Sequence, residues 1–157
     1  MAINGGARLP VQHDDVFPKG ALVMGVEPIT KFQTAEDKAS GRALEPETDK
    51  VSGERLWAVL VIDQAAERKT DAVVTVKIAA PFQPVPPEAI PGTDVRPVIF
   101  ESLTVTPWVD DKACRPGPAG DRHRCRARLG YSLRAKAMTS ALATTPAKGT
   151  GAEKSAA

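Results

Sequence analysis

Residues 55–64 read Arg-Leu-Trp-Ala-Val-Leu-Val-Ile-Asp-Gln, and residues 71–80 read Asp-Ala-Val-Val-Thr-Val-Lys-Ile-Ala-Ala. The first stretch is apolar on both faces for most of its length, which is typical of a buried strand. In the second, apolar side chains from Val74 to Ile78 alternate onto one face. Because only residues 65–70 separate the two stretches, we expect them to form an antiparallel hairpin.

Three more stretches have the apolar content of strands, namely residues 21–33, 97–109 and 129–138. Gly25 predicts a bend or bulge in the first of them. In the second, the apolar phase changes near residues 101–102, which predicts a bulge or a corner where the strand passes between two sheets. In the third, we expect the side chains in phase with Leu129, including Tyr131 and Leu133, to face the core.

The segments between these strands lack apolar periodicity. Residues 34–54 form a long acidic loop, and residues 110–128 form a basic one. Residues 81–97 contain six prolines, so they must cross between strands without a regular helix. A single helical turn over residues 86–90 is the exception that we expect there.

Five principal strands with a crossing segment between the third and the fourth favour an all-β protein with a small five-stranded OB-like barrel. A small open β-sandwich is the alternative. We expect a polar N-terminal lead-in over residues 1–16, one barrel domain over residues 17–138, and a disordered C-terminal tail over residues 139–157.

The composition narrows the class of protein further. The chain has 157 residues, and only 4% of them are aromatic, so we expect an aliphatic core. No apolar run approaches the 18 or more residues of a transmembrane helix. The N-terminus lacks a basic segment followed by an apolar one, so we expect no signal peptide and a cytoplasmic protein.

Positive charge is concentrated in one segment, although the formal net charge of the chain is only +2. Residues 112–136 carry eight basic side chains and one acidic one, Asp121. Such a segment can bind phosphates even when the whole protein is nearly neutral. A solvated loop whose charges maintain solubility is the alternative interpretation.

Both cysteines, Cys114 and Cys125, lie in this basic segment together with His123. A structural zinc site takes four ligands at regular spacing, and three ligands in this pattern do not provide one. We therefore expect no metal site. Two unpaired thiols are favoured over a disulfide, because a cytosolic compartment disfavours stable disulfides.

No catalytic motif is present in the sequence. We find no phosphate-binding Gly-Lys-Ser/Thr motif, no dinucleotide-binding glycines and no Ser/His/Asp pattern. The acidic pairs at residues 14–15 and 110–111 are typical of solvated turns. We expect a protein that is not an enzyme and that has no cofactor.

Trp108 is the best candidate for an exposed ring that stacks on nucleic-acid bases. It follows Thr104 and Thr106 at a period of two, so it shares their expected outward face, whereas Phe100 and Tyr131 are expected in the core. Basic side chains that project from the strands and the basic loop complete the candidate site. Its residues are Trp57, Lys77, Trp108, Arg122, Arg124, Arg126, Arg128, Arg134 and Lys136.

Several short segments follow one another in a characteristic order. They are Val16-Phe17-Pro18-Lys19-Gly20, Val26-Glu27-Pro28, Leu56-Trp57-Ala58-Val59, Val74-Thr75-Val76-Lys77-Ile78-Ala79, Gln83-Pro84-Val85-Pro86-Pro87-Glu88-Ala89, Pro97-Val98-Ile99-Phe100-Glu101, Leu103-Thr104-Val105-Thr106-Pro107-Trp108-Val109 and Tyr131-Ser132-Leu133-Arg134-Ala135. This order resembles the actinobacterial plasmid replication, integration and excision activator family, over about residues 15–138. The resemblance implies an accessory role in the life cycle of a mobile genetic element, and it implies no catalytic residue.

Two hypotheses follow from the sequence. In the first, a mobile-element accessory protein binds DNA, with single strands favoured, through a basic β face that carries an aromatic ring. In the second, the chain regulates a replication initiator or recombinase by protein contact, using residues 34–54 and 81–97. Short exposed barrel edges also favour pairing into a homodimer.

Overall fold

The computed structural model describes residues 6–115, 117 and 125–144. The elements in chain order are β1 (Leu9–Pro10), α1 (His13–Val16), β2 (Ala21–Pro28), α2 (Ala35–Ala39), β3 (Leu56–Asp63), η1 (Lys69–Asp71), β4 (Val73–Ala79), β5 (Arg96–Glu101), β6 (Thr104–Asp110), β7 (Arg128–Ala135), β8 (Ala137–Ser140) and η2 (Ala141–Thr144). The expected all-β class is therefore confirmed.

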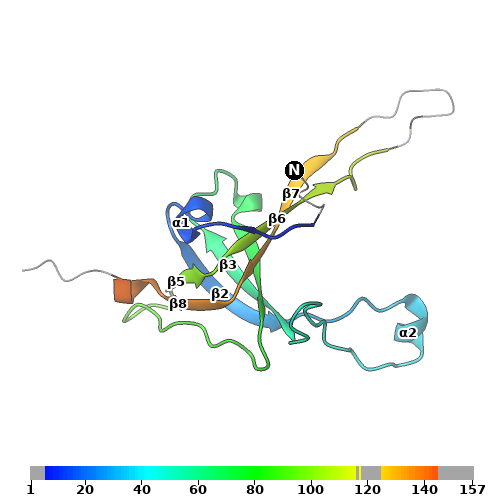
Figure 1. Ribbon diagram of the computed structural model, residues 1–157, viewed down its shortest axis with the longest axis horizontal. Helices are drawn as coiled ribbons and strands as arrows, with labels where there is room; N and C mark the ends of the chain where they lie inside the picture. Colours follow the sequence, from blue (N-terminus) through cyan, green and yellow to red (C-terminus); the bar gives the residue numbers. More distant parts are fainter. Residues whose placement is uncertain (1–5, 116, 118–124, 145–157) are drawn as a thin grey trace, which may run out of the picture.

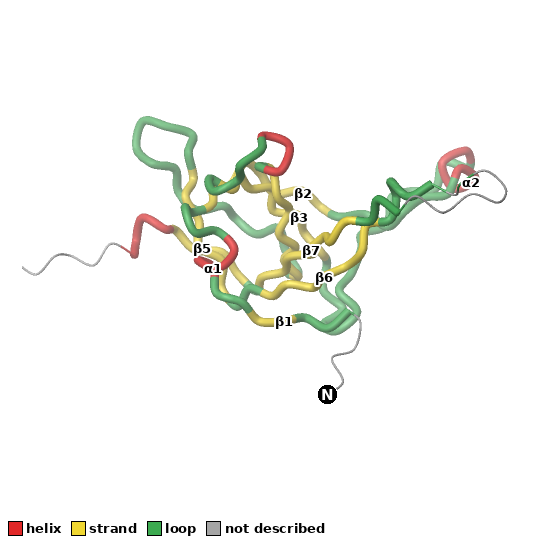
Figure 2. The backbone as a smooth tube through the Cα atoms, turned by 90° about the horizontal axis from the view of Figure 1, so that it is seen from above, coloured by secondary structure: helices red, strands yellow, loops and turns green. Residues whose placement is uncertain are grey.

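All eight strands belong to one curled sheet, in the order β1-β6-β7-β4-β3-β2-β5-β8 (Figure 1). Every neighbouring pair is antiparallel except β4 and β7, which run parallel. Seen from above, the strands wrap around a common centre, and α1 lies close to β5 (Figure 2).

The central hairpin forms as the sequence predicts. β3 and β4 pair antiparallel, with Val59 opposite Val76 and Val61 opposite Val74. Val59, Val61 and Val76 are completely buried. Alternation therefore places one face of this hairpin in the core and leaves the face that carries Lys77 outside.

A bulge in β2 confirms the prediction made from Gly25. Val23 pairs with Val61 while Gly25 pairs with Leu60, so the intervening Met24 has no partner on β3. The extra residue sharpens the local twist of the strand, which helps to curl the sheet.

The structure has eight strands where five were expected, because two predicted strands are each divided and β1 lies before the first of them. The stretch 97–109 divides at Ser102, whose φ of 51° turns the chain between β5 and β6. The stretch 129–138 divides at Lys136, whose backbone N–H donates to Glu101 O at 3.0 Å. The phase change near residues 101–102 was therefore the sequence signal of a corner between two halves of the sheet.

Helices and strands extend past the expected limits of the domain, residues 17 and 138, at both ends. The lead-in 1–16 contains β1 and α1, and His13 is buried. The tail 139–157 overlaps β8, which pairs with β5, and η2, which ends at Thr144. Residues 145–157 lie outside the described part of the chain.

Two local predictions in the connections are also wrong. Residues 86–90 form no helical turn. The acidic loop does contain a helix, α2, whose first turn is capped by reciprocal hydrogen bonds between Thr34 and Asp37. Thr-x-x-Asp is the spacing of such a cap, so this signal was present in the sequence.

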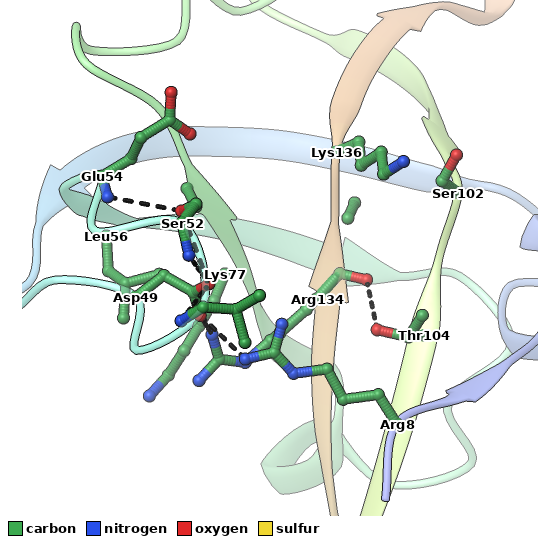
Figure 3. Close-up of a pocket in the computed structure, with 13 residues that line it drawn as sticks. Arg8, Asp49, Ser52, Glu54, Leu56, Lys77, Ser102, Thr104, Arg134 and Lys136 are labelled. Atoms are coloured by element: carbon green, nitrogen blue, oxygen red, sulfur yellow. Dashed lines mark hydrogen bonds and ion pairs between the residues drawn. The ribbon is translucent and has the colours of Figure 1, made fainter.

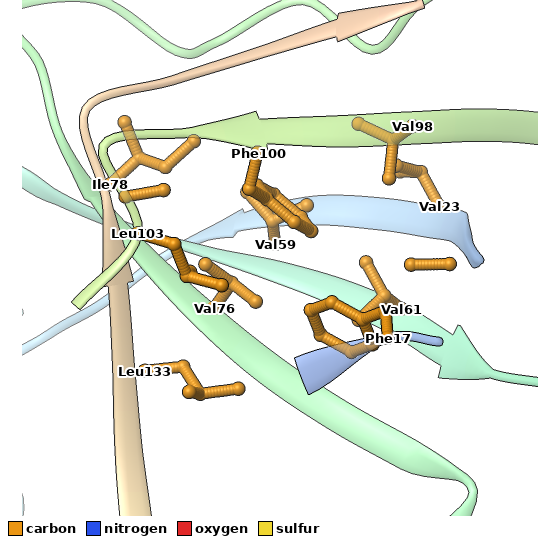
Figure 4. Close-up of a cluster of buried hydrophobic side chains, with 12 residues drawn as sticks. Phe17, Val23, Val59, Val61, Val76, Ile78, Val98, Phe100, Leu103 and Leu133 are labelled. Atoms are coloured by element: carbon orange, nitrogen blue, oxygen red, sulfur yellow. The ribbon is translucent and has the colours of Figure 1, made fainter. Parts of the chain in front are cut away.

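The core lies inside the curl of the sheet, and aliphatic side chains form most of it, as the composition predicts (Figure 4). Phe17 and Phe100 are its aromatic members, with ring centroids 5.9 Å apart. His13 packs against both rings, and its Nδ1 accepts a hydrogen bond of 3.2 Å from the Phe100 backbone N–H. The segment before β2 thus covers one side of the core.

His13 makes the stability of the protein sensitive to acid. Burial lowers the pKa of His13 below 6.5, and this effect outweighs the opposing influence of Asp14. The unfolded chain therefore binds a proton at His13 more readily than the folded chain does. The stabilisation that the neutral His13 side chain provides is complete above about pH 6.5 and is lost as the pH falls. We expect the free energy of unfolding, measured by urea denaturation, to fall between pH 7 and pH 5 by at most about 1.4 kcal/mol per pH unit.

The control is His13→Gln, which cannot bind this proton. Its unfolding free energy at pH 7 should be lower than that of the wild type, but it should change less between pH 7 and pH 5. Equal pH dependence in both proteins would exclude His13 as the source.

Candidate nucleic-acid interface

The outer face of three adjacent strands brings several predicted site residues together. Lys77 on β4 lies beside Arg134 on β7, which in turn lies opposite Thr104 on β6. Two and four residues further along β6, Thr106 and Trp108 follow on the same face by alternation. Lys77, Arg134 and Trp108 therefore share the outer face of β4, β7 and β6.

The first hollow on this face has a volume of about 670 Å³. Residues of all three strands line it, namely Val73, Val74, Thr75, Lys77, Thr106, Trp108, Tyr131 and Ser132. The Trp108 side chain is 44% exposed, so part of the ring is free to contact a ligand.

The ring of Trp108 lies against Gly130, its cross-strand partner on β7. A Cβ atom added at Gly130 would stand 2.6 Å from Trp108 Cε2 and 2.8 Å from Cζ2. Such distances are far below van der Waals contact, so only glycine leaves room for the ring there. This packing holds the ring in a fixed orientation on the outer face.

Gly130→Ala tests this placement. We expect the new methyl group to displace the Trp108 ring and to cost about 1–3 kcal/mol of unfolding free energy, the range for overpacking. In a Trp108→Ala background the same change should cost little, because the ring is gone. The measurement is a double-mutant cycle by urea denaturation, and purely additive costs would contradict the contact.

The second hollow lies further along the same face and has a volume of about 450 Å³ (Figure 3). Four basic side chains line it, namely Arg8, Lys77, Arg134 and Lys136. Two carboxylates, Asp49 and Glu54, and the hydroxyl-bearing residues Ser52, Ser102 and Thr104 complete its polar lining. Lys77 lines both hollows, so the two form one continuous face.

Asp49 anchors two of these cations. It is only 5% exposed, and its Oδ1 accepts hydrogen bonds from Arg8 Nη2 at 2.8 Å and from Arg134 Nη1. Its Oδ2 accepts from the backbone N–H groups of Val51 and Ser52. Burial alone would raise the pKa of Asp49, but the hydrogen bonds from Arg8 and the Ser52 backbone lower the pKa to about 2.

Asp49 consequently balances the charges of both arginines, whereas Lys77 and Lys136 form no ion pair within the described residues. In Figure 3, Arg8 and Arg134 converge on Asp49, while Lys136 extends separately toward Ser102. The two lysines are therefore the cations of this hollow that a ligand can neutralise.

Replacing Asp49 by Asn tests the anchor. The amide keeps the shape but removes the charge, so we expect the free energy of unfolding at pH 7 to fall by about 1–3 kcal/mol. Urea denaturation measures the change. Lys31 and Glu45 form an exposed ion pair at 3.1 Å, so Glu45→Gln is a matched control that should change stability by less than about 1 kcal/mol.

Three predicted aromatic and apolar positions need correction. Trp57 is only 8% exposed, and its Nε1 donates to Ala80 O at 3.0 Å, so its ring is not available for stacking. Tyr131 and Leu129 were expected in the core, but each is 60% exposed. They do face the same side as the buried Leu133, but the β6–β7 hairpin extends beyond the rest of the curled sheet, away from the core (Figure 1).

Two more arginines of the candidate site belong to this projecting hairpin. Arg126 and Arg128 are exposed. Arg122 and Arg124 lie outside the described residues. The reasoning from sequence did not include Arg8 and Asp49 in the site. A turn signal of Asp49 with Ser52 and Gly53 was present, but no local pattern indicates Arg8.

Within residues 6–115, 117 and 125–144, the structure offers neither a cluster of metal ligands nor a membrane-spanning helix. No three histidine, cysteine or acidic side chains there gather as a metal site would require. The helices in those parts are all too short or too polar to cross a bilayer. Comparison with protein families, with characterised proteins and with solved structures found no match.

Proposed function

We propose that this protein binds single-stranded nucleic acid, DNA above all, across the outer face of β4, β7 and β6, without catalysing a reaction. The observation that carries the proposal is the continuity of this face. The exposed part of the Trp108 ring lies in one hollow, and Lys77 joins that hollow to the one lined by Arg134 and Lys136.

The strand pairings support the OB-like barrel as part of this proposal. β5 with β6 is one strand divided at a corner, and β7 with β8 is another. Counted in this way, five strands form a ring, because β2 pairs with both β3 and β5, and β4 pairs with both β3 and β7. The parallel β4–β7 pair then joins the third strand to the fifth.

The position of the hollows also supports this assignment. OB-folds bind oligonucleotides on the face of strands 2 and 3, between the loop that joins strands 1 and 2 and the loop that joins strands 4 and 5. The corresponding segments here are the 29–55 arm that carries α2 and the end of the β6–β7 hairpin. Both project from the same side of the barrel (Figures 1 and 2).

The chemistry of the face suits a single strand. Base stacking on an aromatic ring contributes about 1–3 kcal/mol per base and tolerates any sequence. Lys77 and Lys136, whose charges no ion pair balances within the described residues, would bind the phosphates beside the stacked base. Exposed Arg126 and Arg128 extend the positive charge along the hairpin.

An accessory role in replication, integration or excision of a mobile element is consistent with this binding mode. Those processes expose single strands that a sequence-tolerant protein can cover. The proposal places the protein in the cytoplasm, where such DNA is found, with a replication initiator or recombinase as a further partner.

Fluorescence anisotropy with matched single-stranded and double-stranded oligonucleotides tests the function. We expect preference for the single strand and an affinity that falls steeply with salt. Trp108→Ala should raise Kd about 5-fold to 150-fold, the equivalent of one lost stacking contact. Lys77→Ala should weaken binding and lower the slope of log K against log salt by about 1.

Lys19→Ala is the matched control. Lys19 is exposed and lies three residues after the end of α1. The helix α1 is on the side of the curled sheet away from both arms (Figure 1). The same loss of charge there should leave affinity and salt slope unchanged. Equal losses in Lys19→Ala and Lys77→Ala would show a nonspecific charge effect and would contradict the proposed face.

One observation favours the second candidate function, docking to another protein. Phe82 and Val85, in the proline-rich segment, are 81% and 84% exposed. Gln83 Nε2 donates to Val26 O at 3.0 Å and Arg96 Nη1 donates to Pro87 O at 2.7 Å, which fixes this segment to the barrel. If no oligonucleotide binds at physiological salt, this segment is the surface to examine next.

A further inference from the structure

The two cysteines of the chain lie side by side just beyond the paired part of β6 and β7. The Sγ atoms of Cys114 and Cys125 are 3.9 Å apart, and neither cysteine is in a disulfide. Because a disulfide bond is about 2.05 Å long, the two sulfurs need to approach by only about 1.9 Å. Rotation about side-chain bonds can provide a movement of this size.

Backbone hydrogen bonds hold this pair in place. The N–H of Cys114 donates to Asp111 O at 2.8 Å, which closes a tight turn after β6. The N–H of Arg126 donates across the hairpin to Cys114 Sγ at 3.2 Å. Arg126, the residue after Cys125, is therefore hydrogen-bonded to the Cys114 sulfur. This bond holds the two cysteines close together.

Both thiols are accessible from solvent. Cys125 is exposed and Cys114 is half-buried, so a small oxidant can reach either sulfur. Cysteines with a purely structural role are instead buried in apolar surroundings and inert. Proximity together with accessibility is the arrangement of a redox-responsive pair.

We propose that Cys114 and Cys125 form a reversible dithiol–disulfide pair, oxidised by a low-molecular-weight disulfide such as oxidised glutathione. In the reduced state both thiols are free, as in this structure. In the oxidised state a covalent bond joins the two ends of the segment between them. This inference does not depend on nucleic-acid binding.

The oxidation proceeds by two thiol–disulfide exchanges. The thiolate of one cysteine attacks a sulfur of oxidised glutathione, breaks its S–S bond and releases one glutathione thiolate. The second cysteine then attacks the protein sulfur of this mixed disulfide and releases the other. The protein pair loses two electrons to the oxidant, and its two thiol protons pass to the two glutathione molecules that leave.

Titration of the full chain with oxidised glutathione tests the proposal. We expect the wild type to lose both thiols in a thiol assay without forming a disulfide between two chains, with an intact mass lower by two hydrogens. The mixed disulfide should not accumulate, because the second cysteine is already in contact with the first. Dithiothreitol should restore both thiols.

The single variants Cys114→Ser and Cys125→Ser are the matched controls, since each lacks the resolving thiol. Each should stop at the mixed disulfide and retain one glutathione adduct. Persistent glutathione adducts on the wild type, a disulfide-linked dimer in place of the internal bond, or two thiols that stay free in excess oxidant would each overturn the proposal.

Discussion

Three residue pairs between β4 and β7 determine both the closure of the fold and the arrangement of the candidate site. Val76, Lys77 and Ile78 pair in parallel with Leu133, Arg134 and Ala135. Val76, Ile78, Leu133 and Ala135 point inward and are buried, which joins the β3–β4 hairpin to the β6–β7 hairpin. Lys77 and Arg134, between them, face outward side by side. The pairing that buries the core therefore also sets the spacing of the cations.

Two like charges on neighbouring strands repel, so this arrangement needs a compensating group. Asp49 supplies it from outside the sheet, through the contact of its carboxylate with Arg134. Two backbone hydrogen bonds hold the 49–53 turn that presents Asp49. The N–H of Asp49 donates to Glu54 O, and the N–H of Gly53 donates to Asp49 O. The ion pair between Asp49 and Arg134 thus attaches the arm that carries α2 to the outer face of the sheet, in addition to the covalent connection of the arm to β2 and β3.

Much of the fold was predictable because it depends on local alternation. The β3–β4 hairpin, the bulge at Gly25 and the corner at Ser102 all leave a signature within a few residues of sequence. Alternation correctly placed Trp108 on the outer face, but it gives only the side of a strand, not what covers that side. Tyr131 faces the core side of its strand but lies beyond the core. Trp57 is buried, and its Nε1 donates to Ala80 O, 23 positions away, a contact that no local pattern indicates. Asp49 contacts residues 41 and 85 positions away, so its role could not be derived from its neighbours in the sequence.

The contact of His13 with Phe100 spans 87 positions of the chain, and it has a consequence for how the protein is made. During synthesis the N-terminal segment leaves the ribosome long before β5 exists, so the partner of its imidazole is missing. The pairing of β7 with β4 must wait still longer, until β7 has been translated. Because most contacts of the sheet join distant parts of the chain, folding is expected to be slow for a domain of this size. The nascent chain therefore exposes the apolar β3–β4 hairpin until its last partners arrive, and chaperones can bind it during that interval.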